Sequence, residues 1–446
     1  MGHETDVVIV GGGPGGAASA MWLAEQGIRS TIVEMDPFPR FHIGESMTGE
    51  CGGLVRKLGF TSQMTERGHA VKHGVTVYGT GGKNTFWVPV MRRTETDELE
   101  AFSTWQVRRS EFDSMMLDEA IRRGADLIQA KADTPALGDD GSIGGVRVVD
   151  HNGSTYDIKS KVVIDATGRK TWLANNGVTG PKTRDKYDSQ IAIFSHVKGA
   201  LRDPDEASGN TLIIYQKFLH WSWFIPLDSE VTSVGIVVPS TYFRSKGEKV
   251  EDFYRRELRE LNPELSRRLQ DCEIIEDVRA ATNYSYVVEQ FTGPGFVSVG
   301  DSHRFIDPIF SFGLYLTLYD ARDAAASIAR HLDGKSAPGP NPFLDFQRTS
   351  NRGWEVLQDL IDGFWGNPLA FGYMTHFTSH RSEIIDMFAG RVFGEDMSAA
   401  QVALKKVIAT SPMWARTETG VAAANVVEGR PEDPELEGML AGVTRG

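Results

Sequence analysis

Cysteine is nearly absent from this sequence, because Cys51 and Cys272 are the two residues of that type in 446. They form neither a metal-ligand spacing nor a disulfide framework, so the sequence predicts no bound metal and a reducing compartment, the cytoplasm. Apolar runs of about 18 residues, the length of a membrane span, are absent as well. The chain does not open with a basic segment followed by an apolar one. We therefore expect a soluble protein without a membrane span or a targeting leader.

Positive charge is also scarce, since 47 lysines and arginines stand against 60 aspartates and glutamates, a net charge of -13. Such a balance disfavours direct binding to nucleic acids or anionic membranes, although it leaves room for a basic partner. The length of 446 residues is enough for two domains, or for one large domain with an insertion. We find no internal repeat.

Glycine, by contrast, is abundant, and residues 11–16 read Gly-Gly-Gly-Pro-Gly-Gly. This segment follows an apolar run at residues 6–10 and precedes a helical pattern at residues 17–26. The glycines therefore lie at a strand-to-helix turn, which is the context that a dinucleotide-binding motif requires.

Each glycine of this motif has a physical task. Gly11 permits the tight turn, Gly13 with Pro14 lets the backbone approach a pyrophosphate, and Gly16 lets the helix pack closely on the strand. The next predicted strand ends in Glu34, where a carboxylate would accept hydrogen bonds from ribose hydroxyls.

Two later segments make sense together with the first one. Residues 161–165 form a predicted strand that ends at Asp165 and leads into Ala-Thr-Gly, where small residues up to Gly168 allow close approach to a nucleotide. The segment Gly300-Asp301-Ser302 follows another apolar strand, and its carboxylate would receive the ribityl chain of a flavin. In this order the three segments predict an enzyme that binds FAD.

A long helix is predicted from Leu314 to Leu332, and Pro308 to Gly313 precede it. Free amides at its first turn would stabilise negative charge on a reduced flavin or on a nearby halide. A simple helix start would give the same composition. The residues placed there are Pro308, Ser311, Phe312, Gly313 and Leu314.

The remaining patterns suggest an α/β protein with two sheets. A glycine-rich loop is expected over the cofactor at residues 37–53, with a helix that begins near Leu54. Period-two runs between residues 190 and 239 predict a second sheet on which a substrate rests. We assign residues 1–75, 106–170 and 281–335 to a discontinuous FAD-binding domain, 76–105 and 171–280 to a substrate-binding sheet domain, and 336–446 to a helical C-terminal region with a frayed acidic tail.

The order of these motifs resembles that of the flavin-dependent halogenases, which belong to the FAD monooxygenases. The most specific element is Trp-Ser-Trp-Phe-Ile-Pro at residues 221–226, similar to the family's Trp-x-Trp-x-Ile-Pro signature, although His220 precedes it instead of Gly. Residues 41–46 resemble the family's Gly-Glu-Ser loop, and Phe-Ile-Asp-Pro at 305–308 its second flavin motif. The resemblance covers about residues 5–335.

The resemblance implies a glutathione-reductase-type FAD-binding domain with an inserted antiparallel substrate sheet and a helical C-terminal region. It also implies that reduced FAD reacts with oxygen to form a C4a-hydroperoxide, which oxidises a halide to hypohalous acid. A lysine then passes the halogen to an electron-rich aromatic substrate, of phenol, indole or pyrrole type, free or tethered to a carrier protein. Reduced flavin usually comes from a separate reductase in this family.

Lys72 is the lysine that matches the family's segment, and a surface lysine is the ordinary alternative for it. Lys83 is the weaker competitor. By the same resemblance Arg109, or its neighbour Arg108, lies near the flavin and pyrophosphate as a fixed positive fork, with a plain surface ion pair as the alternative.

The resemblance also gives roles to the tryptophans and to the loop. Trp221 and Trp223 would separate the flavin from the substrate, a role compatible with a core position. Gly44, Glu45 and Ser46 would line or gate the flavin and halide cavity. The alternative is a purely structural role in the loop.

Other functions remain open at this stage. An aromatic hydroxylase on the same scaffold would need neither a halide nor Lys72, and Phe312 at the halide-binding turn departs from the family pattern. A flavin-dependent reductase of the geranylgeranyl-reductase type would share the fold without using oxygen. A flavoprotein that binds FAD and a partner without turnover is the fourth hypothesis. No second dinucleotide motif is evident, so direct use of NAD(P)H is not expected.

Overall fold

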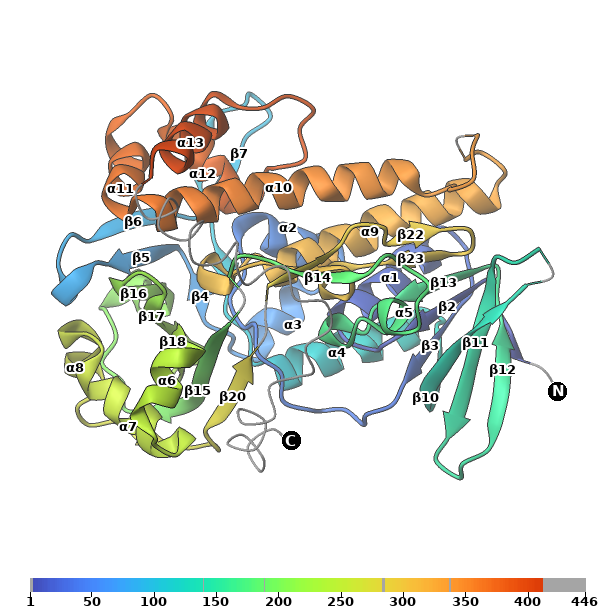
Figure 1. Ribbon diagram of the computed structural model, residues 1–446, viewed down its shortest axis with the longest axis horizontal. Coiled ribbons are helices and arrows are strands. Elements are labelled where there is room, and N and C mark those ends of the chain that lie inside the picture. The colour runs from blue at the N-terminus through green and yellow to red at the C-terminus, as the bar shows by residue number, and fades with distance from the viewer. Residues whose placement is uncertain (1–2, 139, 188, 283–284, 337, 412–446) are drawn as a thin grey trace.

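A computed structural model describes residues 3–411 except 139, 188, 283–284 and 337. Two large sheets lie side by side, two long helices run along the molecule above them, and shorter helices gather at one end (Figure 1). The acidic end of the chain, for which the sequence predicts fraying, lies outside the described residues.

The first sheet has nine strands, and the five in its middle run parallel in the order β10, β3, β2, β13 and β23. Strands β2 and β13 are buried along their whole length, as expected of parallel strands covered on both faces. In pairing order the strands are β1 (His3–Glu4), β12 (Thr155–Lys159), β11 (Ile143–Asp150), β10 (Asp126–Leu137), β3 (Ser30–Glu34), β2 (Val7–Val10), β13 (Val162–Asp165), β23 (Phe296–Ser298) and β22 (Thr292–Gly293).

Strand β2 is a switch point of this sheet, because the chain continues to β3 on one side of it while β13 lies on the other. In open parallel sheets a ligand binds beyond the carboxyl ends of the strands at such a point. The glycine-rich turn after β2 and the Asp165 turn after β13 therefore meet at one edge of the sheet.

The second sheet is antiparallel except where β16 runs beside β5 in the same direction. One of its faces packs on helices α6, α7 and α8, and the other faces the interior of the molecule. In pairing order the strands are β19 (Glu273–Ile274), β15 (Gln190–Lys198), β18 (Val231–Pro239), β17 (His220–Pro226), β16 (Thr211–Lys217), β5 (Gly74–Tyr78) and β6 (Phe86–Pro89), with β20 (Arg279–Thr282) beside β15.

Shorter strands join the larger parts. They are β14 (Lys182–Arg184), β21 (Tyr286–Val288) and β24 (Arg304–Phe305) in one sheet, β4 (Val71–Lys72) with β9 (Thr104–Trp105), and β7 (Met91–Arg93) with β8 (Leu99–Ala101). The predicted domain boundaries near residues 75 and 280 fall inside β5 and β20, which belong to the second sheet. The division into domains remains a proposal.

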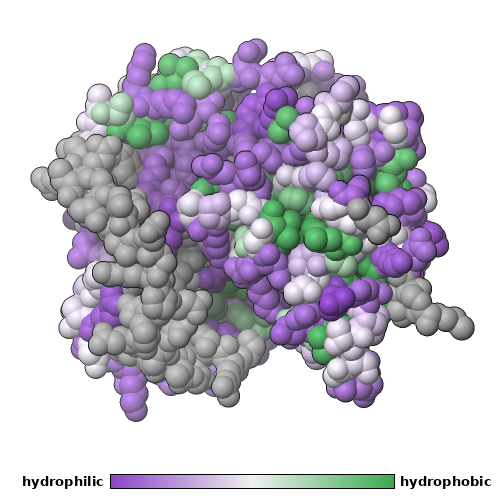
Figure 2. All heavy atoms as spheres, turned by 45° about the vertical axis from the view of Figure 1, so that its right-hand side comes forward, coloured by the Kyte–Doolittle hydropathy of each residue, from purple (hydrophilic) through white to green (hydrophobic). Residues whose placement is uncertain are grey.

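The helices are α1 (Pro14–Glu25), α2 (Gly49–Lys57), α3 (Thr61–Glu66), α4 (Arg109–Arg122), α5 (Trp172–Asn175), α6 (Ser240–Lys246), α7 (Val250–Glu260), α8 (Pro263–Arg268), α9 (Gly313–Leu332), α10 (Leu344–Gly366), α11 (Pro368–Phe377), α12 (Arg381–Ala389) and α13 (Ala399–Thr410). None of the described helices is both long and apolar enough to cross a membrane. The face drawn in Figure 2 is largely hydrophilic, with small separate hydrophobic patches.

Helix α2 corrects one expectation, because it begins at Gly49 and not near Leu54. The Thr48 side chain caps it by accepting a hydrogen bond from the amide of Cys51 at 3.3 Å. Glycine at position 52 is required by packing, since a Cβ atom there would lie 2.5 Å from Thr104 Oγ1. Gly52, one of the glycines that suggested a loop, thus serves close contact within a helix.

Candidate active site

The glycine-rich turn follows β2 and leads into α1. Gly11 has a φ of +103°, and a Cβ atom there would lie 2.5 Å from the carbonyl oxygen of Ala166. A Cβ atom at Gly16 would lie 1.9 Å from the carbonyl oxygen of Gly11. Both residues therefore serve the turn itself. At Gly13 the nearest atom to such a Cβ is Arg40 Nη2 at 3.9 Å, so this glycine leaves open space.

Glu34 lies at the end of β3 and is bound to the same turn. Its Oε2 atom accepts a hydrogen bond from the amide of Gly12 at 2.7 Å, and its Oε1 atom one from the amide of Asp36 at 2.8 Å. Arg40 Nη2 lies 3.8 Å from Oε2. The carboxylate is thus fixed beside the first glycines.

Asp165 stabilises the turn after β13 from within. Its carboxylate accepts hydrogen bonds from the amide and hydroxyl of Thr167, at 2.9 and 2.7 Å, and from the amide of Leu173 at 2.8 Å. Burial raises the pKa of Asp165 to about 6 in spite of these bonds. The residues of this turn that reach the cavity are Thr167, Gly168 and Arg169.

Asp301 follows β23 and offers an unused acceptor. Its Oδ1 atom is buried and has no hydrogen-bond partner among the described residues. Burial raises the pKa of Asp301 to about 6. The turn is held in place by Asp320, which accepts hydrogen bonds from the amide of Gly300 at 3.0 Å and pairs with His303 Nε2 at 2.8 Å.

Helix α9 begins at Gly313 without a side-chain cap, so the amides of its first turn are not used by a capping residue. Ser311, just before it, has a φ of +61°, which turns the chain sharply into the helix. The helix has 20 residues and ends with basic Arg330 and His331. Its N-terminus therefore offers donors and a positive dipole end to a ligand.

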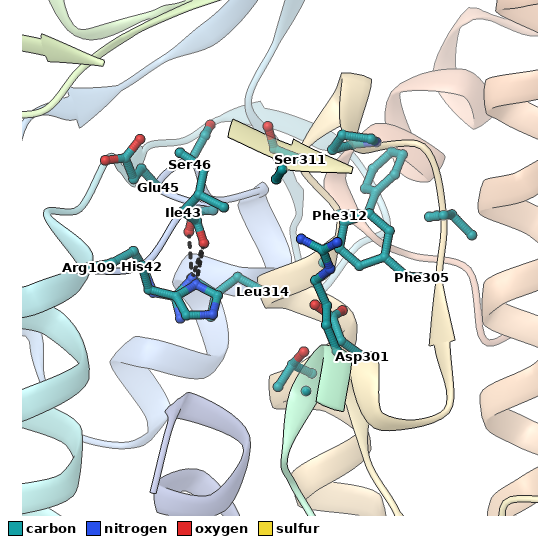
Figure 3. Close-up of a pocket in the computed structure, with 18 of the residues that line it drawn as sticks. His42, Ile43, Glu45, Ser46, Arg109, Asp301, Phe305, Ser311, Phe312 and Leu314 are labelled. Carbon is teal, nitrogen blue, oxygen red and sulfur yellow. Dashed lines mark hydrogen bonds between the residues drawn. The ribbon is translucent and has the colours of Figure 1, made fainter. Parts of the chain in front are cut away.

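These turns open onto one cavity of about 1520 Å³, a volume that includes the space at its mouth. Figure 3 shows Glu45 and Ser46 on one side of it and Asp301, Phe305 and Phe312 on the other. The predicted site residues that line it are Gly13, Pro14, Gly44, Glu45, Ser46, Arg109, Gly168, Trp221, Trp223, Asp301, Pro308, Ser311, Phe312, Gly313 and Leu314.

The other predicted site residues do not line the cavity. Gly11, Gly16, Glu34 and Asp165 shape the turns around it, whereas Lys72 lies behind Ser46. Four more lining residues, His42, Ile43, Thr167 and Phe305, belong to motif segments named in the sequence analysis. Sequence reasoning missed other lining residues, namely Arg169, Ala192, Phe194, Thr211, Ile213, Ala281, Thr317 and Trp354. Those in the second sheet alternate along β15, β16 and β17, so strand periodicity combined with the tryptophan signature was the available signal.

Arg109 anchors the loop between β3 and α2. Its guanidinium makes two bonds to Asp113, at 2.6 and 2.9 Å, and donates to the carbonyl oxygens of Ile43 at 2.7 Å and Gly44 at 3.2 Å (Figure 3). Arg108 instead pairs with Asp228 at 2.9 Å away from the cavity. The arginine that faces the cavity is thus Arg109, whose Nε and Nη2 atoms bind Asp113 while Nη1 holds the loop.

Trp221 and Trp223 stand on β17, on the face of the second sheet that lines the cavity, with ring centroids 6.1 Å apart. Trp223 donates from Nε1 to Ser233 Oγ at 3.0 Å. Trp221 Nε1 is buried and has no partner in the described part of the chain. The two rings form an apolar wall with one open hydrogen-bond donor.

Lys72 is 2% exposed, in contrast to the surface position of an ordinary lysine. Its ammonium donates to Ser46 Oγ at 2.8 Å and to the carbonyl oxygen of Met47 at 2.9 Å. Burial lowers the pKa of Lys72 to about 7. Lys83, the competing lysine, is exposed. Of the two, only Lys72 touches a residue that lines the cavity.

His220, which departs from the family pattern, and His303 both lie outside the cavity lining. His220 stacks edge to face on Tyr242, with centroids 4.9 Å apart. His303 is buried between Asp320 and the ring of Phe291, whose centroid lies 3.8 Å away. The contacts of both histidines are packing and hydrogen-bond contacts within the fold. Phe312, by contrast, does line the cavity.

The cavity fits FAD on three features of the structure. The open space at Gly13 admits a pyrophosphate, the unpaired Asp301 Oδ1 can accept a hydrogen bond from a ribityl hydroxyl, and the α9 amides can face the flavin pyrimidine. The residues available to hold the cofactor therefore agree with the donor and acceptor pattern of FAD.

Comparison with known proteins settles the family. A model described as an FAD binding domain matches residues 4–340. A 1H-pyrrole-2-carbonyl-(peptidyl-carrier protein) brominase of Pseudoalteromonas luteoviolacea is 36% identical over 388 residues, which cover 87% of this chain and 92% of that protein. The chain belongs to the flavin-dependent halogenases.

Two further relatives agree with this. A 1H-pyrrole-2-carbonyl-(peptidyl-carrier protein) chlorinase of Pseudomonas fluorescens is 25% identical, over 91% of this chain and 94% of that protein. The solved structure of the flavin-dependent brominase Bmp2 has a TM-score of 0.85 and 34% identity, over 93% of this chain and 100% of that one. The predicted fold, the FAD cofactor and the assignment as an FAD-dependent oxidoreductase are confirmed.

Proposed function

We propose that this halogenase uses reduced FAD from a separate reductase, oxygen and a halide ion to halogenate a pyrrole tethered to a carrier protein in the cytoplasm. The substrate is inferred from the brominase and the chlorinase, whose names specify a pyrrole on a peptidyl-carrier protein. The observation that carries the proposal is the buried contact between Lys72 and Ser46, a residue of the cavity wall.

When bound, reduced FAD would supply two electrons to oxygen, and the partly reduced oxygen would then oxidise the halide. The α9 amides and Asp301 would hold its isoalloxazine and ribityl chain, and Gly13 would admit its pyrophosphate. Trp221 and Trp223 would keep the aromatic substrate away from the flavin, so that oxidised halogen reaches it instead of oxygen.

Lys72 would receive the oxidised halogen as hypohalous acid. Two of the three hydrogen atoms on the Lys72 ammonium are donated to Ser46 and Met47, which leaves the third for the halogen species. Because the pKa of Lys72 is about 7, ammonium and amine are both present at neutral pH. The ammonium polarises hypohalous acid through a hydrogen bond, whereas the amine forms an N–halogen bond as the O–halogen bond breaks and water leaves.

Product analysis tests this proposal. We expect the protein, with FAD, a flavin reductase and bromide, to brominate pyrrole-2-carboxylate bound to a carrier protein, and free pyrrole-2-carboxylate at most weakly. Mass spectrometry of the released acyl group would show the bromine isotope pattern, and omission of halide should abolish it. An oxygenated product formed without halide would support the hydroxylase alternative instead.

The source of electrons gives a separate prediction. We expect NADPH alone to reduce the bound flavin slowly, because the chain has no second dinucleotide motif. A separate reductase or chemically reduced FAD should support turnover. Stopped-flow absorbance at the flavin band measures this directly. Rapid bleaching by NADPH alone would show that the chain has its own nicotinamide site.

A further inference from the structure

A carboxylate of the cavity wall is paired with a histidine that the sequence analysis did not single out. Glu45 is 1% exposed and lines the cavity. Its Oε1 atom lies 2.6 Å from His196 Nε2, on strand β15, although the two residues are 151 positions apart in the sequence. Glu45 Oε2 is buried and has no hydrogen-bond partner among the described residues. One oxygen is thus bound to the imidazole and the other is free to act.

The other ring nitrogen of His196 is also held by a carboxylate. Nδ1 lies 3.0 Å from Oε1 of Glu276, whose side chain is 31% exposed. The ring of Phe41 covers the imidazole with centroids 5.6 Å apart. His196 does not line the cavity, so its proton reaches the cavity through Glu45.

Charged groups of both signs surround this triad. Glu45 comes from the loop before α2 and Glu276 from the segment before β20. Arg108, before α4, lies 3.6 Å from Glu276 Oε1, and Arg279, on β20, lies 3.5 Å from Oε2. Burial alone would lower the pKa of His196, but the hydrogen bonds and charges of Glu276 and Glu45 outweigh it and raise the pKa to about 9. At neutral pH the imidazole therefore carries both protons.

The proposed reaction needs a proton inside the cavity. Reduced FAD in its neutral form, oxygen, a halide ion and an aromatic C–H group yield FAD, a carbon–halogen bond and two waters, and the charge balances only if one proton is taken up; an anionic reduced FAD would need a second proton. A side chain that lines the cavity can supply this proton as a general acid.

We propose that Glu276, His196 and Glu45 form a relay that supplies this proton in each turnover, with His196 as the store and Glu45 as the group that delivers it. The proposal rests on the proposed function and adds a positioning residue, His196, to the site. Glu276 fixes the proton on Nδ1, so the transferable proton is the one on Nε2.

The transfer breaks the Nε2–H bond as an O–H bond forms at Glu45 Oε1, and rotation of the carboxyl group then turns that O–H bond towards the cavity. The carboxylic acid then gives the proton to an oxygen atom in the cavity, and nothing is oxidised or reduced in these steps. His196 is left neutral with its proton on Nδ1. A proton from solvent restores Nε2 when the cavity opens to release product.

Titration of the FAD-bound protein with labelled histidines tests the store itself. The NMR signal that is missing in His196→Gln identifies the residue. We expect it to titrate near pH 9 in the wild type and to move towards the ordinary value of 6.5 in Glu276→Gln, whose partly exposed side chain keeps its shape. A wild-type signal that titrates near 6.5 would overturn the proposal.

Single turnovers from chemically reduced FAD with bromide test delivery. Between pH 8 and 9, above the pKa of Lys72, the wild-type rate should stay level, and above about 9, where the store loses its proton, it should fall. His196→Gln should halogenate about 100-fold more slowly at pH 8 with unchanged FAD affinity, and added imidazole should restore part of the rate. Glu276→Gln should show the same fall at lower pH.

The matched control is Lys198→Gln, two residues along the same strand, where the lysine pairs with exposed Glu230 at 2.8 Å. It should keep the wild-type rate and pH profile. If His196→Gln keeps the wild-type rate and pH profile, the relay is contradicted, and the triad serves only as an ion pair that holds the loop. A wild type that yields no halogenated product would count against the proposed function, whereas the NMR titration measures the proton store directly.

Discussion

Replacing Gly13 with leucine is expected to abolish FAD binding while the protein stays folded. The Cβ atom would meet no atom closer than 3.9 Å, so the backbone accepts the substitution, and the side chain would extend into the cavity where the pyrophosphate must approach. We expect Kd for FAD to rise at least about 100-fold, equivalent to about 2.7 kcal/mol. Fluorescence titration measures the affinity, and thermal unfolding checks the fold.

Gly394→Leu is the matched control, because Gly394 also has no atom within 4 Å of an added Cβ but lies outside the cavity. It should bind FAD normally. Gly16→Leu, in contrast, should fail to fold, since its Cβ would lie 1.9 Å from the Gly11 carbonyl oxygen. Unchanged FAD affinity in a folded Gly13→Leu protein would remove this turn from the cofactor site.

The backbone motifs could be predicted from the sequence because their causes are local. A tight turn between a strand and a helix needs glycine at defined positions, and the structure shows such a requirement at Gly11 and Gly16. The long helix after Gly313 was predicted for the same reason, from composition within one segment. The start of helix α2 was predicted wrongly because glycine at position 52 is required by its packing against Thr104, a residue far away in the chain.

Contacts across the two sheets could not be predicted in this way. The pairing of Glu45 with His196 depends on the loop after β3 folding over the second sheet, and no local sequence pattern near either residue predicts this contact. Arg109 is an intermediate case, since its partner Asp113 is four residues further along the same helix. That spacing was available as an ion-pair signal and would have shown that the guanidinium is already engaged.

The burial of Lys72 could not be predicted from the sequence either, and a surface lysine remained the ordinary alternative. Strand β4 pairs with β9 and brings the side chain beneath the loop, where Ser46 and Met47 accept its hydrogen bonds. The assignment by family resemblance thus acquires a physical basis. A buried amine with a pKa of about 7 beside the cavity is suited to exchange between a charged donor and a neutral nucleophile.

Lys72→Ala is expected to eliminate halogenated product while FAD binding and the uncoupled formation of peroxide persist. The variant removes the group that we propose receives hypohalous acid and leaves the α9 terminus and the glycine turn untouched. We expect a loss of at least about 1000-fold, within the range found when an essential acid or base is removed. Product mass spectrometry and a peroxide assay measure the two outcomes side by side.

Two companion variants make this result specific. Lys72→Arg should fail as well, because a guanidinium keeps its charge but neither places its donors at the same point nor forms the same nitrogen–halogen species. Lys83→Ala, at an exposed lysine in the turn before β6, should retain full activity. If the wild type gives an oxygenated product without halide and Lys72→Ala retains that activity, the reaction at this site is hydroxylation. The buried lysine would then serve the loop through Ser46 and Met47, and not the chemistry.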